Sequence, residues 1–295
     1  MRNSVIFVPV IQRILLPVDF SPRDAAAAHY VKELSRKLAV KVILLHVVPP
    51  PDYEAAVLEA GGAALQQLID TRKRIAQEKI DKAGETELAG LDVERVLVSG
   101  FPSDEILEYA EKEKVDLIVM PTHGYGPFRR FLLGSVVSKV LHDAHVPVLT
   151  SAHMADPNLD PIEFDTVAAA IDLSENSGPV LKYAASLAQE LGAKLKVMHA
   201  LAEISGHMGF SLGEPERPHF EAAARERINA LGADLSLPFE VHIELGDPGK
   251  VICQMAHSTS TDLVVIGRSS ASGLGRLRAH AYSIIRESNV PVISV

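Results

Sequence analysis

The sequence contains little cysteine and no long apolar run, and each deficit excludes a class of protein. One cysteine, Cys253, in 295 residues rules out an intramolecular disulfide and a thiol-rich metal site. No apolar run approaches the roughly 20 residues that a membrane-spanning helix requires. The first residues, MRNSVIFVPVIQ, lead into an apolar strand pattern without a small-residue cleavage site, which argues against a secretory signal. We therefore expect a cytoplasmic protein without a membrane partner.

Basic charge is also scarce, since the formal net charge is −9. This balance argues against a nucleic-acid partner that relies on a basic surface. The histidines show no paired spacing typical of zinc, so no metal site is expected. The sequence also contains no P-loop, serine-hydrolase elbow or kinase signature. The remaining composition, 47% hydrophobic and 23% charged, is typical of a globular protein with a substantial core.

Five landmarks occur twice in the same order. The segment RILLPVDF at 13–20 corresponds to DTVAAAID at 165–172, and each carries an aspartate at its end. The later pairs are KVILLHVV and KLKVMHA, SGFPSDEIL and LGDPGKVIC, VDLIVMPTHG and TDLVVIGRSS, and VPVLTS and VPVISV. Such order indicates a duplicated domain. We predict copy one over residues 1–151, a linker over 152–163, where acidic residues and prolines interrupt the apolar pattern, and copy two over 164–295.

Short apolar runs alternate with longer amphipathic stretches in both copies. The runs do not alternate apolar with polar residues, so the strands are expected to be buried on both faces, as in a parallel sheet covered by helices. The predicted fold class is α/β, with two tandem doubly wound domains, each a five-stranded parallel sheet flanked by helices. In copy one the predicted strands are 13–18, 41–48, 92–99, 115–120 and 146–150, and the predicted helices are 22–39, 53–85, 103–113 and 135–143. Ser21 is the predicted N-cap of the first helix.

The loop after the fourth strand of copy one has the composition of a phosphate site. It reads MPTHGYGPFRRFLLGS, and nine residues separate Gly124 from Gly134-Ser135. Glycine permits positive φ and close approach of the backbone to a ligand. The unpaired N–H groups and the dipole at the start of the next helix favour a phosphate. A loop-to-helix junction capped by serine is the alternative interpretation of the same residues.

Copy two departs from this pattern. Ser270 replaces the second glycine of the loop, Gly124 in copy one. The Gly-Ser position falls on His280-Ala281 when counted from Gly267, or on Arg278-Ala279 when counted back from Pro291. With either count a side chain occupies the space that a phosphate needs. We therefore predict that copy two binds no nucleotide.

Other residues of copy one are placed to contact a nucleotide, because ligands of such sheets bind at the carboxyl ends of the strands. Asp19 can accept hydrogen bonds from an adenine amino group or a ribose hydroxyl, or it can cap the turn before the first helix. The backbone of Val47 can read a base edge. Arg129 lies within the loop beside Arg130, and at least one of the two faces solvent. His123 has no recognisable partner for acid–base catalysis, so a structural or ligand-positioning role is favoured.

The ordered set PVDFS, LLHVV, GFP, DLIVM, THG-x9-GS and VPVL resembles the universal stress protein family over nearly the whole chain. One branch of that family binds ATP through the pattern G-x2-G-x9-G-(S/T). The resemblance implies that Asp19 and Val47 hold the adenosine, and that Gly124, Gly134, Ser135 and Val136 hold ribose and phosphates. The complete candidate set is Pro17, Val18, Asp19, Val47, Met120, Pro121, His123, Gly124, Arg129, Gly134, Ser135 and Val136.

One departure bears on function, because Pro121 stands where the family pattern has its first glycine. Proline has no N–H, and losing one hydrogen bond costs on the order of 1 kcal/mol. We therefore predict a weakened site for ATP or a related adenine nucleotide in copy one, with or without Mg²⁺, that acts as a regulatory ligand of a stress-response protein. The alternatives are an interaction scaffold that binds no nucleotide and, less favoured, a slow ATPase or phosphotransferase.

The last strand of each copy predicts how the copies associate. VPVLTS and VPVISV would be exposed sheet edges if nothing covered them. In the family, similar edge strands pair two domains. The resemblance therefore implies that the two copies pair within one chain, and that chains form a homodimer.

Overall fold

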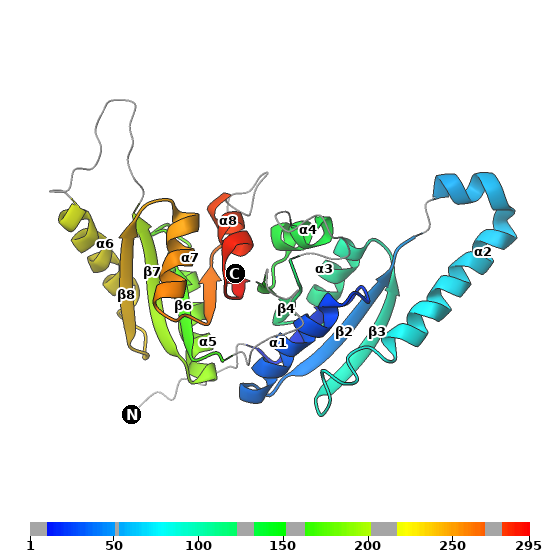
Figure 1. Cartoon of the computed structure of the whole chain (residues 1–295), viewed down its shortest axis with the longest axis horizontal. Helices are drawn as coiled ribbons and strands as arrows, with labels where there is room; N and C mark the ends of the chain where they lie inside the picture. Colours follow the sequence, from blue (N-terminus) through cyan, green and yellow to red (C-terminus); the bar gives the residue numbers. More distant parts are fainter. Residues whose placement is uncertain (1–10, 51–52, 123–132, 152–162, 202–216, 269–278) are drawn as a thin grey trace.

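The chain folds into two α/β units with the same order of elements, copy one and copy two (Figure 1). This computed structural model describes residues 11–50, 53–122, 133–151, 163–201, 217–268 and 279–295. Copy one contains β1 (Arg13–Pro17), α1 (Arg23–Lys37), β2 (Lys41–Val48), α2 (Tyr53–Ile80), β3 (Asp92–Ser99), α3 (Pro102–Lys112), β4 (Leu117–Val119), α4 (Ser135–Asp143) and β5 (Val148–Thr150). Copy two contains β6 (Thr166–Ala170), α5 (Ser177–Leu191), β7 (Lys194–Leu201), α6 (Arg217–Leu231), β8 (Phe239–Leu245), α7 (Pro248–Ser258), β9 (Leu263–Ile266), α8 (Ala279–Glu287) and β10 (Val292–Ser294).

The strands of both copies form one continuous sheet in the order β3-β2-β1-β4-β5-β10-β9-β6-β7-β8. Strand neighbours within each copy run parallel, which confirms the two predicted five-stranded parallel sheets. The copies meet where β5 and β10 pair antiparallel, so the predicted pairing of the last strands within the chain is also confirmed. The paired residues are Val148 with Ser294, Leu149 with Ile293, and Thr150 with Val292.

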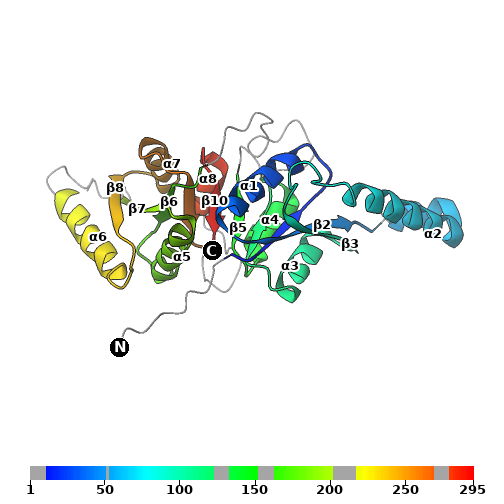
Figure 2. The same cartoon turned by 90° about the horizontal axis from the view of Figure 1, so that it is seen from below.

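This register is symmetric about the Leu149–Ile293 pair. Val148, Leu149 and Thr150 correspond in the repeat to Val292, Ile293 and Ser294, and each end residue pairs with the counterpart of the other. A pseudo-two-fold axis therefore passes between Leu149 and Ile293 and relates α4 to α8. Figures 1 and 2 both show these two helices beside one another at the centre of the molecule.

Both faces of the sheet are buried, as the apolar runs predicted. In β1, Ile14 and Leu16 pack in one layer and Leu15 packs in the other. The first layer is completed by α1, α2, α5 and α6, and the second by α3, α4, α7 and α8. Each fully buried Leu or Ile contributes about 1.5–3 kcal/mol relative to an exposed one, so such strands favour two helical layers.

The start of α1 differs from the prediction. The N-cap is Pro22, no side chain caps the helix, and the Ser21 hydroxyl is buried without a partner among the described residues. Phe20 adopts a left-handed conformation with φ 62°. This turn directs the Ser21 N–H to Asp19 Oδ1 at 2.9 Å, so the helix begins after Pro22 and Ser21 does not cap it.

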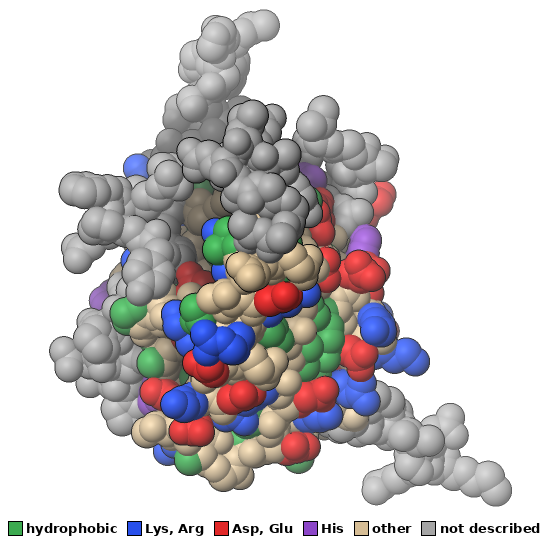
Figure 3. Space-filling model, turned by 90° about the vertical axis from the view of Figure 1, so that its right-hand side faces the viewer, with side chains coloured by type: hydrophobic (Ala, Val, Ile, Leu, Met, Phe, Trp, Pro, Cys, Tyr) green, Lys and Arg blue, Asp and Glu red, His purple; other side chains and the backbone are tan. Residues whose placement is uncertain are grey.

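The outer surface of copy one carries mixed charges. Residues 71–79 of α2 are exposed except for Ala76, as expected for a solvated face. Acidic and basic side chains are interspersed on this end of the molecule (Figure 3), and Arg74 pairs with Glu78 at 2.7 Å. Among the described helices, none combines the length and the apolar character that a bilayer crossing requires.

Two tyrosines at equivalent positions provide a matched test of packing. Tyr30 in α1 shares a hydrogen bond with Ser151 Oγ at 3.3 Å, whereas the Tyr183 hydroxyl in α5 is buried without a partner in the described part of the chain. We expect Tyr30→Phe to lower the free energy of unfolding by about 1 kcal/mol. Tyr183→Phe removes an unsatisfied buried hydroxyl and is expected to leave stability unchanged or raise it by up to about 1 kcal/mol. Urea denaturation of both variants checks the opposite signs, and equal losses would contradict them.

Candidate functional site

The candidate residues of copy one gather where β1, β2 and β4 end. β1 ends at Pro17, and the Val18 N–H then donates to the Leu45 carbonyl at 2.9 Å. Val18 is buried, whereas the following Asp19 side chain is exposed. This edge lies at the topological switch point between β1 and β4, where doubly wound sheets bind ligands.

Asp19 performs the turn-capping role that was one of its two predicted roles. Its Oδ1 accepts the Ser21 N–H at 2.9 Å. In copy two, Asp172 Oδ1 likewise accepts the Ser174 N–H at 3.0 Å and the Ser177 hydroxyl at 3.2 Å. The same geometry in both copies shows that the aspartate shapes the strand-to-helix turn. Because Asp19 is exposed, the turn does not prevent its carboxylate from meeting a ligand.

Val47 presents its backbone beyond the end of β1. The Leu45 carbonyl faces β1, since it accepts from Val18, and the Val48 carbonyl faces β3, since it accepts from Gly100 at 3.1 Å. Successive residues of a strand alternate in direction, so the N–H and C=O of Val47 face the β1 side, where β1 has ended. The geometry therefore leaves these two groups at the edge where a base was predicted to bind.

A histidine behind this edge was not predicted from the sequence. His46 Nδ1 lies 2.7 Å from the Val18 carbonyl, and its ring lies 4.1 Å from the Phe20 ring. A carbonyl only accepts, so Nδ1–H is the donor. Burial lowers the pKa of His46, which favours this neutral form. His199 repeats the contact with the Ile171 carbonyl at 2.8 Å, so the recurrence of histidine in LLHVV and KVMHA was the available signal.

The first turn of α4 is open in the sense that no side chain of the described residues caps it. Gly134 is the N-cap, and the Gly134 N–H donates to the Thr122 carbonyl at 3.0 Å. The serine-cap interpretation is therefore wrong, because exposed Ser135 is the first residue inside the helix. Gly134 has φ −60° and ψ 149°, so it does not use the positive φ that glycine permits. A glycine here leaves room in front of the first-turn N–H groups, without being needed by the backbone conformation.

The remaining predicted residues divide into described and undescribed ones. Met120, directly after β4, is buried and its N–H donates to the Leu149 carbonyl at 3.1 Å, while the following Pro121 is half-buried. Val136 is half-buried in the first turn of α4. His123, Gly124 and Arg129 lie outside the described residues.

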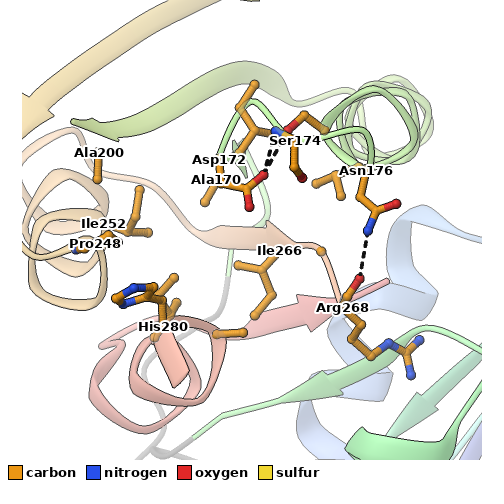
Figure 4. A pocket seen from close by; sticks show the side chains of 16 residues that line it. Ala170, Asp172, Ser174, Asn176, Ala200, Pro248, Ile252, Ile266, Arg268 and His280 are labelled. Atoms are coloured by element: carbon orange, nitrogen blue, oxygen red, sulfur yellow. Dashed lines mark hydrogen bonds between the residues drawn. The ribbon is translucent and has the colours of Figure 1, made fainter. Parts of the chain in front are cut away.

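A cavity of about 170 Å³ occupies the equivalent position of copy two (Figure 4). Its lining is mostly apolar, and the polar groups Asp172, Ser174 and Asn176 lie on one side, with His280 across from them. Its lining residues include the counterparts of the copy-one candidates. They are Ala170 for Pro17, Ile171 for Val18, Asp172 for Asp19, Ala200 for Val47, Ile266 for Met120, Gly267 for Pro121 and His280 for Val136.

The cavity keeps the first glycine of the loop but not the Gly-Ser pair. A Cβ on Gly267 would lie 2.9 Å from Val180 Cγ2, so packing against α5 requires glycine there. α8 ends at Glu287 and α4 ends at Asp143, 144 positions earlier, which is also the offset between Pro291 and Pro147, so the helix ends agree with the count back from Pro291. The counterpart of Gly134 is then Arg278, which lies outside the described residues.

Comparison with known proteins assigns the family. The sequence profile described as the universal stress protein family matches residues 11–151 and again residues 163–295. The chain belongs to the universal stress protein family. Universal stress protein MJ0531 of Methanocaldococcus jannaschii is 32% identical over 138 residues, 47% of this chain and 80% of that protein. Universal stress protein MJ0577 of the same organism is 33% identical over 150 residues, 47% of this chain and 93% of that protein.

The tandem arrangement has a counterpart among solved structures. A universal stress protein from Archaeoglobus fulgidus superposes with a TM-score of 0.72 at 25% sequence identity. The superposition covers 96% of this chain and 97% of that chain, and therefore both copies. This universal stress protein thus shares its two-copy architecture with a protein of known structure.

Asp24 is a further acidic group beside the copy-one site of this universal stress protein. The Asp19 N–H lies 3.5 Å from Asp24 Oδ1 in the first turn of α1. Burial, followed by the nearby Asp19 charge, raises the pKa of Asp24 to about 7. Asp24 therefore takes up a proton near neutral pH, which the sequence alone did not indicate.

The pKa of Asp24 predicts that stability falls as pH rises. The pKa is raised from 3.8 to about 7 in the folded state. Between these values the folded protein holds a proton that the unfolded chain has released, so stability declines over this range and levels off above it. We expect Asp24→Asn to remove on the order of 2 kcal/mol of this decline, after allowance for partial exposure. Urea denaturation from pH 5 to pH 8 measures it. The exposed Asp70→Asn is the control, and an unchanged decline in Asp24→Asn would contradict the prediction.

Other reactive groups are few among the described residues of this universal stress protein. Burial raises the pKa of the Cys253 thiol to about 11, so the thiol is not a nucleophile at neutral pH. No group of three or more His, Cys, Asp or Glu side chains in the described ranges is arranged to hold a metal ion.

Proposed function

We propose that this universal stress protein binds ATP or a related adenine nucleotide in copy one as a regulatory ligand. The observation that carries the proposal is the open first turn of α4 behind Gly134. Its N–H groups and the helix dipole favour a phosphate. Exposed Asp19 and the backbone of Val47, at the ends of β1 and β2, supply hydrogen-bonding groups for ribose and base.

We place the binding site for the triphosphate in copy one and not in copy two. In copy two, Arg278, Ala279 and His280 stand in the sequence at the positions of Gly134, Ser135 and Val136. The apolar cavity of copy two is suited to a base-sized group, since about 170 Å³ is below the roughly 300–1,000 Å³ of sites for larger ligands. We therefore propose one nucleotide site per chain.

Pro121 supports the alternative of an interaction scaffold. It removes a backbone N–H directly after β4, where Gly267 keeps one in copy two. Hydrolysis is less well supported, because the described residues around α4 offer no assigned base for the attacking water. We thus propose a binding protein rather than an enzyme, which binds the nucleotide with or without Mg²⁺.

Retention of nucleotide through purification tests the proposal. Freshly purified protein is heat-denatured, and the supernatant is analysed by chromatography and mass spectrometry. We expect about one adenine nucleotide per chain, because only copy one has a Gly-Ser pair, Gly134-Ser135, at the start of its fourth helix. No retained nucleotide, together with no heat on titration with Mg-ATP, would favour the scaffold. Two nucleotides per chain would overturn the assignment to copy one.

A further inference from the structure

Copy two contacts the N-terminal end of α4. The Tyr282 hydroxyl on α8 accepts a hydrogen bond from the Leu133 N–H at 3.3 Å. Leu133 is buried and directly precedes Gly134, the N-cap of α4. A side chain of copy two therefore fixes the residue beside the open first turn.

Copy two also holds the C-terminal end of α4. Arg268 Nη1 donates to the Ala144 carbonyl at 2.6 Å, and Nη2 donates to the Val146 carbonyl at 2.8 Å. Ala144 is the C-cap of α4, where a cation stabilises the negative end of the helix dipole. Figure 4 shows the Arg268 side chain leaving the cavity toward the strands of copy one, while its backbone carbonyl accepts from Asn176.

In the described residues, the copy-one counterparts of Arg268 and Tyr282 are different side chains. The counterpart of Arg268 is Thr122, whose hydroxyl bonds within copy one to the Ser151 carbonyl at 3.5 Å. The counterpart of Tyr282 is Ser138, whose side chain is too short to replace a tyrosine. The pseudo-two-fold axis would make such contacts reciprocal if the copies were identical. The counterpart side chains differ, so the contacts that Arg268 and Tyr282 make with copy one are specific to copy two.

At the C-terminal end of α8, a serine of copy two makes the hydrogen bond that Arg268 makes at the end of α4. The counterparts of Ala144 and Val146 are Ser288 and Val290. There the Ser288 hydroxyl donates to the Val290 carbonyl at 2.8 Å, as Arg268 does for Val146 in copy one. The carbonyl after α8 therefore accepts a hydrogen bond from a side chain of its own copy, whereas the equivalent carbonyl after α4 accepts from Arg268 of the other copy.

We infer that Tyr282 and Arg268 are positioning residues of copy two that orient α4 for phosphate binding in copy one. The inference rests on the proposed function of copy one. Donors that bind phosphate act best when they are held within about 0.5 Å of the productive geometry by surrounding contacts. With both ends of α4 held by copy two, the copy that lost the Gly-Ser pair has a role in the nucleotide site of the other.

Three variants test this inference in the full chain. Tyr282→Phe keeps the ring and removes the hydroxyl, and Arg268→Met keeps an apolar stem and removes the two donors. Arg268→Met combined with Ala144→Ser introduces in copy one the serine that caps the end of α8 in copy two. Tyr183→Phe is the matched control, because it removes a tyrosine hydroxyl of copy two that has no described partner. Calorimetric titration with Mg-ATP and, separately, with adenosine measures the two Kd values.

The two ligands separate positioning from general loss of structure. We expect Tyr282→Phe to raise the Kd for Mg-ATP roughly 2- to 10-fold, and Arg268→Met roughly 3- to 30-fold. The Kd for adenosine, which lacks the phosphates that we propose bind at α4, should change less than about twofold. Ala144→Ser should recover most of the loss caused by Arg268→Met, and Tyr183→Phe should leave both Kd values unchanged.

Each other outcome contradicts a specific statement. Unchanged ATP binding in both Tyr282→Phe and Arg268→Met would overturn the positioning role and leave the proposed function standing. Equal weakening of ATP and adenosine would also overturn it, since the whole fold would then be affected. A starting protein that binds neither ligand would overturn the proposed function, and the positioning role with it.

Discussion

Gly134→Arg is expected to abolish nucleotide retention and to weaken Mg-ATP binding by roughly 100-fold or more, because the side chain would fill the space before the open first turn of α4. The fold should tolerate the change. Gly134 has φ −60° and ψ 149°, which any L-residue adopts, and copy two carries Arg278 at the equivalent position. The loss would therefore report on the ligand site and not on the backbone. Calorimetric titration with Mg-ATP measures it, alongside thermal denaturation of the nucleotide-free protein.

Gly134→Ala is the matched control for this position. Its methyl group tests whether volume alone interferes, and we expect at most about a tenfold loss of affinity. The exposed Ser135→Ala removes only a hydroxyl donor beside the same N–H groups. If Gly134→Arg bound Mg-ATP as well as the unchanged protein does, the phosphate could not lie at α4, and the proposed site would have to be abandoned.

Ile293→Ala is expected to lower the free energy of unfolding by about 2–4 kcal/mol, the usual cost of truncating a fully buried isoleucine. Ile293 lies opposite Leu149 where β10 joins β5, and both side chains are fully buried in the same layer. The cavity would open at the junction of the two copies, where the sheet is continuous. Both copies should therefore lose stability together, in one transition.

Chemical denaturation followed by fluorescence and circular dichroism measures this loss. Ile243→Ala in β8 is the matched control, since the same truncation at a partly buried position of an edge strand should cost less than about 1.5 kcal/mol. Leu149→Ala and the double variant complete a cycle, in which directly opposed residues should couple by about 0.5–2 kcal/mol. Equal losses at Ile293 and Ile243 would show that the junction is not a fully packed part of the core.

The sequence predicted the strands better than the turns between strands and helices. The run KVILLHVV matches β2 to the residue. A strand that is buried on both faces reads as a nearly continuous apolar run, so its bounds are visible in the sequence. The predicted N-cap of α1, Ser21, was wrong, because the turn before the helix contains the left-handed Phe20 and a hydrogen bond from the Ser21 N–H to Asp19. Such a conformation in a non-glycine residue has no compositional signal.

The candidate site was predicted in outline and not in its electrostatics. Asp19 and Val47 could be placed because they follow strands whose carboxyl ends share one edge. Asp24 and His46 could not, since the pKa of each depends on burial that only the folded chain creates. The hydrogen bonds from Leu133 to Tyr282 and from Arg268 to Ala144 join residues more than 120 positions apart, so they could be found only in the structure. The homodimer and the cytoplasmic location stay predictions.

The β5–β10 junction also governs how the molecule responds to dilution. When two partners belong to one chain, their association is intramolecular, with an effective concentration in the millimolar range that does not fall as the protein is diluted. A dimer of single-copy chains would come apart at low concentration and lose any contact made across the junction. In this chain the contacts from copy two to α4 persist at any concentration at which the fold itself survives. The nucleotide binding proposed for copy one therefore does not require two chains to associate across this junction.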